Sequence, residues 1–191
     1  MKNSTGVPLL HSVREYFEQL RSAISNTEVE GGTESALKLM RGCFEKATTE
    51  GNKVIFIGNG GSNAIASHLA GDISKNGGIR AIAFNDTPTL TMLGNDFGYE
   101  SVFSKQLEFY GFKNDVLVAI SSSGGSTNIL RAAEKAKEIG IRLFTFTGMV
   151  RTAENRLKNM GELNFVVPST DYGIVEIAHL SLIHSVIEKQ V

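Results

Sequence analysis

From Lys53 onward the chain alternates short apolar runs with longer amphipathic stretches, and this alternation limits the possible folds most. Strands are predicted for the five runs rich in β-branched and aromatic residues, at 54–57, 80–84, 115–120, 142–147 and 163–167. Helices are predicted between and after them, at 63–75, 88–94, 100–110, 126–139, 152–159 and 174–190. The runs are continuously apolar, which is typical of strands covered on both faces. Alternating strands and helices predict an α/β fold with a parallel sheet and right-handed crossovers.

Two helices are predicted before this α/β part. Apolar residues recur at spacings of three and four in the first of them, at Leu10, Val13, Phe17, Leu20 and Ile24. This stripe could pack on its own domain or against a partner chain, and the sequence leaves both open. The second helix starts at Thr33 and ends near Gly51. We expect a single domain over 1–191, with a helical extension at 1–51 and the α/β core at 52–191.

The composition excludes several classes of protein. With 191 residues, 41% of them hydrophobic, the chain can bury a sizeable core. A net charge of −1 without a Lys/Arg block gives no sign of a nucleic-acid partner. Cys43 is the only cysteine, which excludes an intrachain disulfide and a thiolate zinc cage, and we expect it to be buried. No signal peptide or long apolar span is visible, so we expect a cytoplasmic protein with no membrane partner.

Two polar, glycine-rich loops each join a predicted strand to a helix: "GNGGSN" at 58–63 and "SSSGGSTN" at 121–128. Ligands of parallel α/β sheets bind at the carboxyl ends of strands. Serine hydroxyls and free N–H groups at a helix N-terminus can bind an anion there without a formal positive charge. Neither loop matches the dinucleotide or P-loop patterns. A plain strand-to-helix turn is the alternative for each.

Taken in order with "GNDFG" at 94–98, these two loops resemble the sugar isomerase (SIS) domain family, and within it the phosphoheptose isomerases. Those enzymes interconvert sedoheptulose 7-phosphate and a heptopyranose 7-phosphate. The similarity covers nearly the whole chain. It implies a flavodoxin-like three-layer sandwich with a five-stranded parallel sheet, preceded by N-terminal helices. It also implies a homotetramer and a phosphorylated sugar as substrate.

The resemblance assigns binding residues by position. Phosphate would be held by the serine loop, at Ser121, Ser122, Ser123 and Ser126. The sugar would be lined by Asn59, Gly60, Gly61, Ser62, Asn95 and Asp96. For Asn95 and Asp96, turn formation is the alternative, because these residue types also favour turns.

Aldose–ketose isomerisation passes through an enediol and needs a base for a carbon-bound proton and an acid for the oxygens. His68 and Asp72 are four residues apart on one predicted helix and so share a face. The resemblance makes Asp72 the counterpart of a general-base glutamate, whose side chain is one methylene longer than that of Asp72. It makes His184 the counterpart of a general-acid histidine. It aligns Glu176 with a glutamine of the family. The glutamate in this chain therefore adds a negative charge beside the substrate.

The resemblance also implies a metal site, because zinc is bound at the matching positions in some members of the family. The four positions are His68, Asp72, Glu176 and His184, and they imply one Zn²⁺ per subunit and no organic cofactor. Glu176 and His184 are eight residues apart, about 12 Å along a straight helix, so both cannot bind one ion from one straight helix. Either the helix starts after Glu176, or a second chain contributes. We therefore expect active sites at subunit interfaces. His179 should face away from His184 and have a structural role.

The sequence therefore predicts an isomerase of a phosphorylated sugar, converting sedoheptulose 7-phosphate to D-glycero-D-manno-heptose 7-phosphate. Two alternatives remain: a non-catalytic binding protein, like the family member that associates with the replication initiator protein, and a sugar-phosphate sensor without turnover. The presence of both His68 and His184 favours the enzyme, because a pure binder needs no imidazole at these positions.

Overall fold

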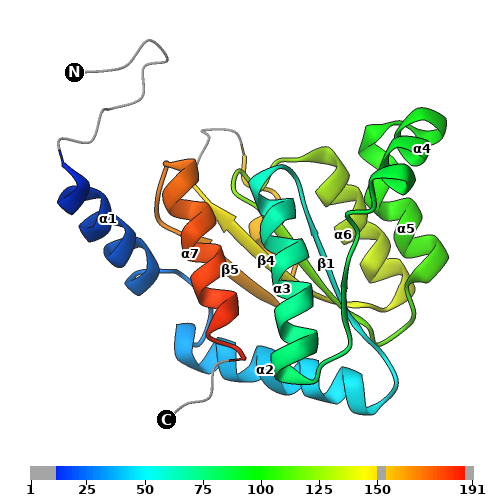
Figure 1. Ribbon diagram of the computed structural model, residues 1–191, viewed down its shortest axis with the longest axis horizontal. Coiled ribbons are helices and arrows are strands. Elements are labelled where there is room, and N and C mark those ends of the chain that lie inside the picture. The colour runs from blue at the N-terminus through cyan, green and yellow to red at the C-terminus, as the bar shows by residue number, and fades with distance from the viewer. Residues whose placement is uncertain (1–11, 150–153, 188–191) are drawn as a thin grey trace.

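Five parallel strands form one sheet in the order β2-β1-β3-β4-β5. The computed structural model describes residues 12–149 and 154–187 (Figure 1). The strands are β1 (Val54–Gly58), β2 (Ala81–Ala83), β3 (Val116–Ser121), β4 (Arg142–Gly148) and β5 (Leu163–Val167). All five predicted strands are confirmed. The strand order is that of flavodoxin-like folds, and it reverses direction between β1 and β3, which is where such sheets bind ligands.

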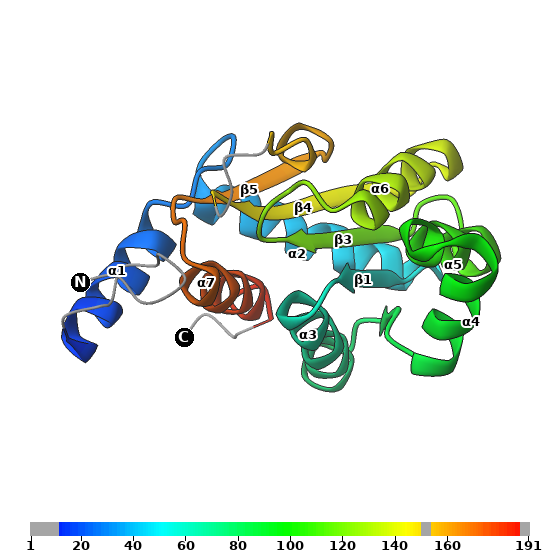
Figure 2. The same ribbon diagram turned by 90° about the horizontal axis from the view of Figure 1, so that it is seen from above.

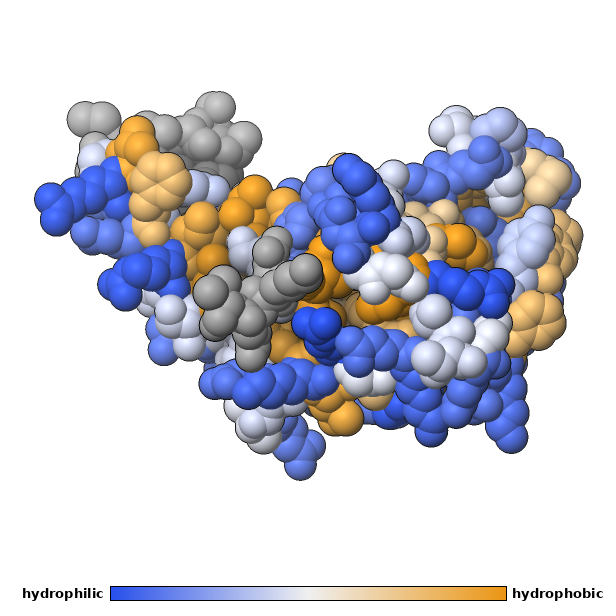
Figure 3. Space-filling view, turned by 60° about the horizontal axis from the view of Figure 1, so that its bottom comes forward, coloured by the Kyte–Doolittle hydropathy of each residue, from blue (hydrophilic) through white to orange (hydrophobic). Residues whose placement is uncertain are grey.

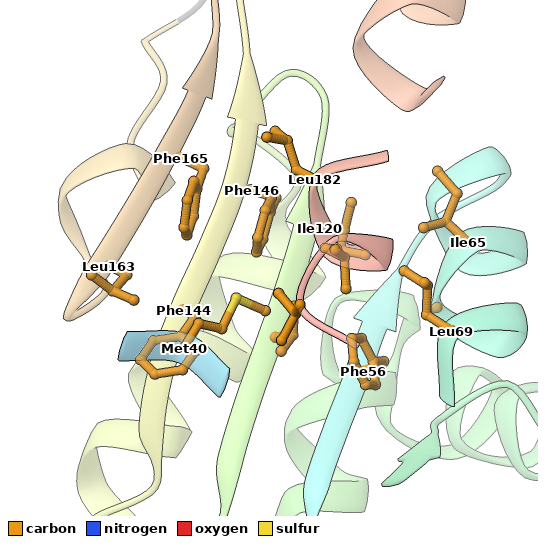
Figure 4. Close-up of a cluster of buried hydrophobic side chains, with 14 of the residues drawn as sticks. Met40, Phe56, Ile65, Leu69, Ile120, Phe144, Phe146, Leu163, Phe165 and Leu182 are labelled. Atoms are coloured by element: carbon orange, nitrogen blue, oxygen red, sulfur yellow. The ribbon is translucent and has the colours of Figure 1, made fainter. Parts of the chain in front are cut away.

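One face of the sheet is covered by α2 (Thr33–Thr49), α3 (Gly61–Gly77) and α7 (Tyr172–His184). Figure 2 shows α3 and α7 side by side on this face, with α1 (Val13–Ser25) beyond α7. Aromatic side chains of the strands fill the space beneath these helices; Phe146 and Phe165 stack with ring centroids 4.4 Å apart (Figure 4). Met40 of α2 is fully buried in the same cluster, so α2 is part of this layer.

The opposite face carries α4 (Thr87–Phe97), α5 (Val102–Tyr110) and α6 (Thr127–Ile139), with two short 3₁₀ turns, η1 (Tyr99–Ser101) and η2 (Leu157–Asn159). Neighbouring residues of β1 point to different layers: Phe56 packs under α3, and Ile55 packs with the α4–α6 layer. Because both faces are buried, the strand sequences are continuously apolar. The predicted three-layer sandwich is confirmed.

Two helix predictions are wrong: the helix expected at 152–159 and the end of the last helix. A helix was expected at 152–159, but the described residues form only η2 there, and 150–153 lie outside the described part. Asn155 explains the difference, because its side chain accepts from the backbone N–H of Lys158 and donates to the carbonyl of Gly148, competing with helical hydrogen bonds. The last helix ends at His184 instead of 190; turn hydrogen bonds follow, from Val186 to Ile183 and from Ile187 to His184. Residues 188–190 of that prediction lie outside the described residues.

The N-terminal helix α1 packs along α7 and is partly buried there through Leu20 and Ile24. Val13 and Phe17 of its apolar stripe are exposed, and Leu10 lies outside the described residues. Cys43 is buried as expected. Within the described ranges, every helix is too short or too polar to cross a bilayer.

Candidate functional site

The two glycine-rich loops lie beside one another at the carboxyl edge of the sheet. Gly58 of β1 pairs with Ile120 of β3, so Asn59 and Ser121 start the loops from adjacent strands. Each loop turns sharply into a helix: Gly60, at φ 54°, precedes α3, and Ser126 precedes α6. Neither of these two N-cap residues makes a side-chain capping hydrogen bond. Within the described part of the chain, the N–H groups of Gly61, Thr127 and Asn128 have no acceptor, so these groups at the very start of the two helices are available to an anion.

A pocket of about 170 Å³ lies between the loops. Its lining consists of Asn59, Ser62, Ile120, Ser121, Ser122, Ser123, Ser126, Tyr172 and Glu176. The structure thus brings together all four serines that were predicted to hold phosphate. Ser122 Oγ is buried and has no hydrogen-bond partner in the described part of the chain. An unpaired buried hydroxyl is costly, and an anion oxygen in the pocket would satisfy it.

The two loops are joined by a pair of side-chain amides. Asn59 Nδ2 donates to Asn128 Oδ1 over 2.9 Å, and Asn128 Nδ2 donates to Asn59 Oδ1 over 2.8 Å. The hydroxyl of Tyr99 also donates to Asn59 Oδ1, at 3.0 Å. Asn59 therefore lines the pocket with its side chain held by two other segments of the chain.

Two imidazoles and a carboxylate meet where α3 and α7 run side by side. His68 Nε2 lies 3.2 Å from His184 Nε2 and 3.4 Å from Asp72 Oδ2. The three residues each offer a ligand atom within 4.8 Å of the others. All three side chains are at least partly exposed, so substrate and solvent can reach them. His68, Asp72 and His184 are called the triad below.

The donor set of the triad fits a zinc ion. Two nitrogens at ordinary zinc distances in a tetrahedral site are about 3.3 Å apart, close to the separation of the two Nε2 atoms. A carboxylate oxygen completes three protein ligands, which is the number that catalytic zinc sites use. The same 3.2 Å separation also suits an N–H···N hydrogen bond between one protonated and one bare ring nitrogen.

Glu176 lies in the serine-lined pocket and outside the triad. The prediction allowed for a helix that starts after Glu176, and this is wrong, since α7 begins at Tyr172 and continues to His184. The Glu176 carboxyl instead packs against the Cα of Gly61, in the first turn of α3, where a side chain at position 61 would collide with it. Burial raises the pKa of this carboxyl above its usual value.

Asn95 and Asp96 lie apart from the pocket lining in this chain. Both are exposed in the last turn of α4, and Asn95 Nδ2 donates to Asp96 Oδ1 over 2.8 Å. The turn expected as their alternative is wrong, because they belong to a helix. His179 is fully buried, and its Nε2 lies 3.0 Å from the Thr147 carbonyl oxygen, which confirms the predicted structural role.

Sequence reasoning missed three residues around the pocket: Tyr99, Asn128 and Tyr172. Asn128 stands at the end of the "SSSGGSTN" loop, so its place beside the serines was a usable signal. Tyr99 and Tyr172 gave no comparable signal, because the sheet order decides which segments surround the loops.

Comparison with known proteins supports the resemblance to the SIS domain family. The SIS domain model matches residues 15–148. The chain is 36% identical over 178 residues to "Phosphoheptose isomerase" of Campylobacter jejuni, covering 90% of this chain and 92% of the relative. It is 32% identical over 185 residues to that of Fusobacterium nucleatum, covering 94% and 92%.

Two solved structures extend the comparison to the fold. The phosphoheptose isomerase of Neisseria gonorrhoeae aligns with a TM-score of 0.78 at 30% identity, over 92% of this chain and 95% of that one. The phosphoheptose isomerase of Francisella tularensis aligns with a TM-score of 0.80 at 28% identity, over 92% and 94%. The chain belongs to the SIS domain family, as its sequence and its fold show.

Proposed function

We propose that this protein is an aldose–ketose isomerase that converts sedoheptulose 7-phosphate to D-glycero-D-manno-heptose 7-phosphate. One observation carries the proposal: a carboxylate and two imidazoles meet on helices that also border a serine-lined pocket with an unpaired buried hydroxyl. The relatives named phosphoheptose isomerase support the choice of reaction and of sugar.

In the proposed reaction, the serine pocket holds the phosphate and the triad acts on the other end of the sugar. The Asp72 carboxylate takes a proton from C1 of the ketose, and the electrons of that C–H bond form the C=C bond of the enediol. His184 gives a proton to the oxygen on C2. Asp72 then returns its proton to C2 while His184 takes the proton from the oxygen on C1, which leaves the aldose.

We further propose that His68 Nε2, His184 Nε2 and one Asp72 oxygen would hold one Zn²⁺, which leaves the other Asp72 oxygen and His184 Nδ1 for the proton transfers. Zn²⁺ bound there would supply Lewis-acid stabilisation of charge on a substrate oxygen. Glu176 can join such a set only from a second chain, because α7 is continuous between Glu176 and His184. A homotetramer with active sites at subunit interfaces is therefore part of the proposal. The cytoplasmic location stays a prediction.

The first test measures turnover of sedoheptulose 7-phosphate and a panel of other ketose phosphates by the purified protein. We expect the aldose product from sedoheptulose 7-phosphate, and a fall in kcat of about 10²–10⁴-fold in both Asp72→Asn and His184→Gln. Glu138→Gln, on the exposed end of α6, is the matched control and should keep full activity. Full activity in both site variants would contradict the roles of Asp72 and His184. Binding of the sugar without turnover of any substrate would point to a sensor.

A chelator arm tests the metal separately. Activity should fall on treatment with chelator and return when Zn²⁺ is added, and metal analysis should find zinc in unmodified protein and less in His68→Gln. Unchanged activity and metal content after chelation would contradict the zinc proposal and leave the isomerase proposal standing.

A further inference from the structure

Asn128 is the second residue of α6, is only 3% exposed, and takes no part in the proton transfers of the proposed reaction. Its side-chain oxygen is fully engaged, since Oδ1 accepts from the backbone N–H of Ile129 and from Asn59 Nδ2, and one N–H of Nδ2 donates to Asn59 Oδ1. Asn59 belongs to the loop after β1, so this amide pair connects the two loops that form the pocket.

The backbone determines which way round this amide pair lies. The N–H of Ile129 is shared between the Ser126 carbonyl and Asn128 Oδ1, and a flipped Asn128 amide would set its own N–H donors against this N–H, so the oxygen of Asn128 lies on that side. The same oxygen faces Asn59, which must then offer its nitrogen there. Asn59 Oδ1 consequently faces Asn128 Nδ2, and the Tyr99 hydroxyl donates to it from the other side. The orientation of the Asn59 amide is thus set by a hydrogen bond to the backbone of α6.

The Asn59 side chain has one hydrogen-bonding group left for a ligand, and this group is a donor. Its oxygen already accepts two hydrogen bonds, and one of its two N–H groups donates to Asn128. The second N–H group is left for a ligand, and Asn59 lines the pocket. Phosphate oxygens accept such a bond, whereas a flipped amide would present an oxygen to them and repel them.

We propose that Asn128 is a positioning residue for binding of the sugar phosphate: it holds the Asn59 amide in the orientation that presents an N–H donor to the ligand. This inference rests on the proposed function for the identity of the ligand. Asn128 does not itself line the pocket, so it acts through Asn59.

The test replaces Asn128 by leucine, which has a similar shape and no charge but cannot hold the amide. We expect KM for sedoheptulose 7-phosphate to rise about tenfold or more with a much smaller change in kcat, because the lost bond serves substrate and transition state alike. Calorimetry measures the Kd for sedoheptulose 7-phosphate directly when Asp72→Asn prevents turnover. In that background, Asn128→Leu should raise the Kd by the same factor as KM. Failure of the proposed function appears separately, as absence of turnover by the unmodified protein.

Asn164→Leu is the matched control. Asn164 also holds a loop through its amide, bonding to Gly161 and Thr145, but it lies near the amino end of β5, away from the pocket. Both variants should lower the melting temperature, and only Asn128→Leu should raise KM and Kd. Equal KM and Kd in the two variants would overturn the inference.

Tyr99→Phe keeps the inference testable if Asn128→Leu fails to fold. Tyr99 is 61% exposed, so the change leaves the core intact and removes one of the two donors to Asn59 Oδ1. We expect KM to rise about threefold, since one of two bonds holding the amide remains. Unchanged KM and Kd in this variant would also count against the inference.

Discussion

At the scale of single residues, the clearest question is whether Asp72 is long enough to do the work of the glutamate that the family resemblance expects there. Its Oδ2 lies 3.4 Å from His68 Nε2 and 3.9 Å from His184 Nδ1. The shorter side chain therefore reaches both imidazoles from α3. Contact with the two histidines does not require the extra methylene.

His179 supports a prediction about stability in acid. Burial lowers its pKa from 6.5 to about 4, although the Thr147 carbonyl acting on Nε2 opposes this shift. Above pH 6.5 the imidazole is neutral in both folded and unfolded chains. As the pH falls below 6.5, only the unfolded chain takes up the proton until the pH nears 4. The free energy of unfolding should therefore fall by about 3 kcal/mol over this interval through His179 alone.

Urea denaturation at a series of pH values checks this. His179→Leu should be less stable at neutral pH, because it removes the buried hydrogen bond to the Thr147 carbonyl, but its stability should fall less steeply between pH 6.5 and 4. Phe146→Leu removes the aromatic neighbour of His179 without removing an ionisable group, so it should keep the steep fall. Equal slopes in all three proteins would show that His179 does not cause the acid sensitivity.

At the scale of elements, the start of α3 is the feature that shapes the site. Gly60 has φ 54° and ψ −122°, a backbone conformation that is the mirror image of the extended region and open in practice only to glycine. This turn lets the chain leave β1 and enter α3 beside the pocket, with the N–H of Ser62 donating to the Asn59 carbonyl. Gly61 then leaves room for the Glu176 carboxyl of α7.

Two glycine substitutions on this element should have opposite effects. Gly60→Ala should lower the free energy of unfolding by about 1–3 kcal/mol through backbone strain, although the space around position 60 is open. Gly71→Ala, on an exposed interior turn of the same helix with open space for a Cβ, should raise it by about 0.5–1 kcal/mol. Thermal and urea unfolding measure both. A neutral Gly60→Ala would mean that the loop relaxes to another turn without cost.

At the scale of the whole molecule, the surface near α1 shows apolar groups without a partner in the described chain. Val13 is 72% exposed and Phe17 is 61% exposed, although both belong to the same apolar stripe of α1 as Leu20 and Ile24. A cavity of about 870 Å³ lies between α1, α2 and α7, with Ile24, Leu37, Leu182 and Val186 in its lining. Figure 3 shows hydrophobic side chains on this face between hydrophilic ones. Such surfaces commonly mark association with another chain.

We predict that α1 forms part of the subunit interface. Phe17→Glu should convert the proposed tetramer to smaller species in sedimentation or light-scattering measurements, because the charge would be buried at the contact. The isomerase activity should fall with it if a second chain completes each site. Phe109→Glu is the matched control, an exposed aromatic on α5 on the other side of the sheet, and should keep the mass of the unmodified protein. An unchanged mass for Phe17→Glu would contradict a role of α1 in assembly.

Much of the fold and part of the candidate site could be predicted from the chain alone. The strand runs are apolar without interruption, so even the three-residue β2 was found, and the four pocket serines stand together in one loop. The segment at 152–159 was mispredicted because the Asn155 side chain competes for backbone hydrogen bonds there. Glu176 was assigned to the metal set by position, but its distance from His184 depends on how far α7 continues.

The sequence by itself determined the α/β class and the two glycine-rich loops, because these depend on local patterns of apolar, glycine and polar residues, and its resemblance to a family supplied the residues of the triad. Only the tertiary structure decided that β1 and β3 are neighbours, which brings the two loops together and allows Asn59 to pair with Asn128. It also decided that His68 and His184, 116 residues apart, lie within 3.2 Å. Contacts between distant segments follow from strand order and helix packing, and a single sequence carries no local signal for either.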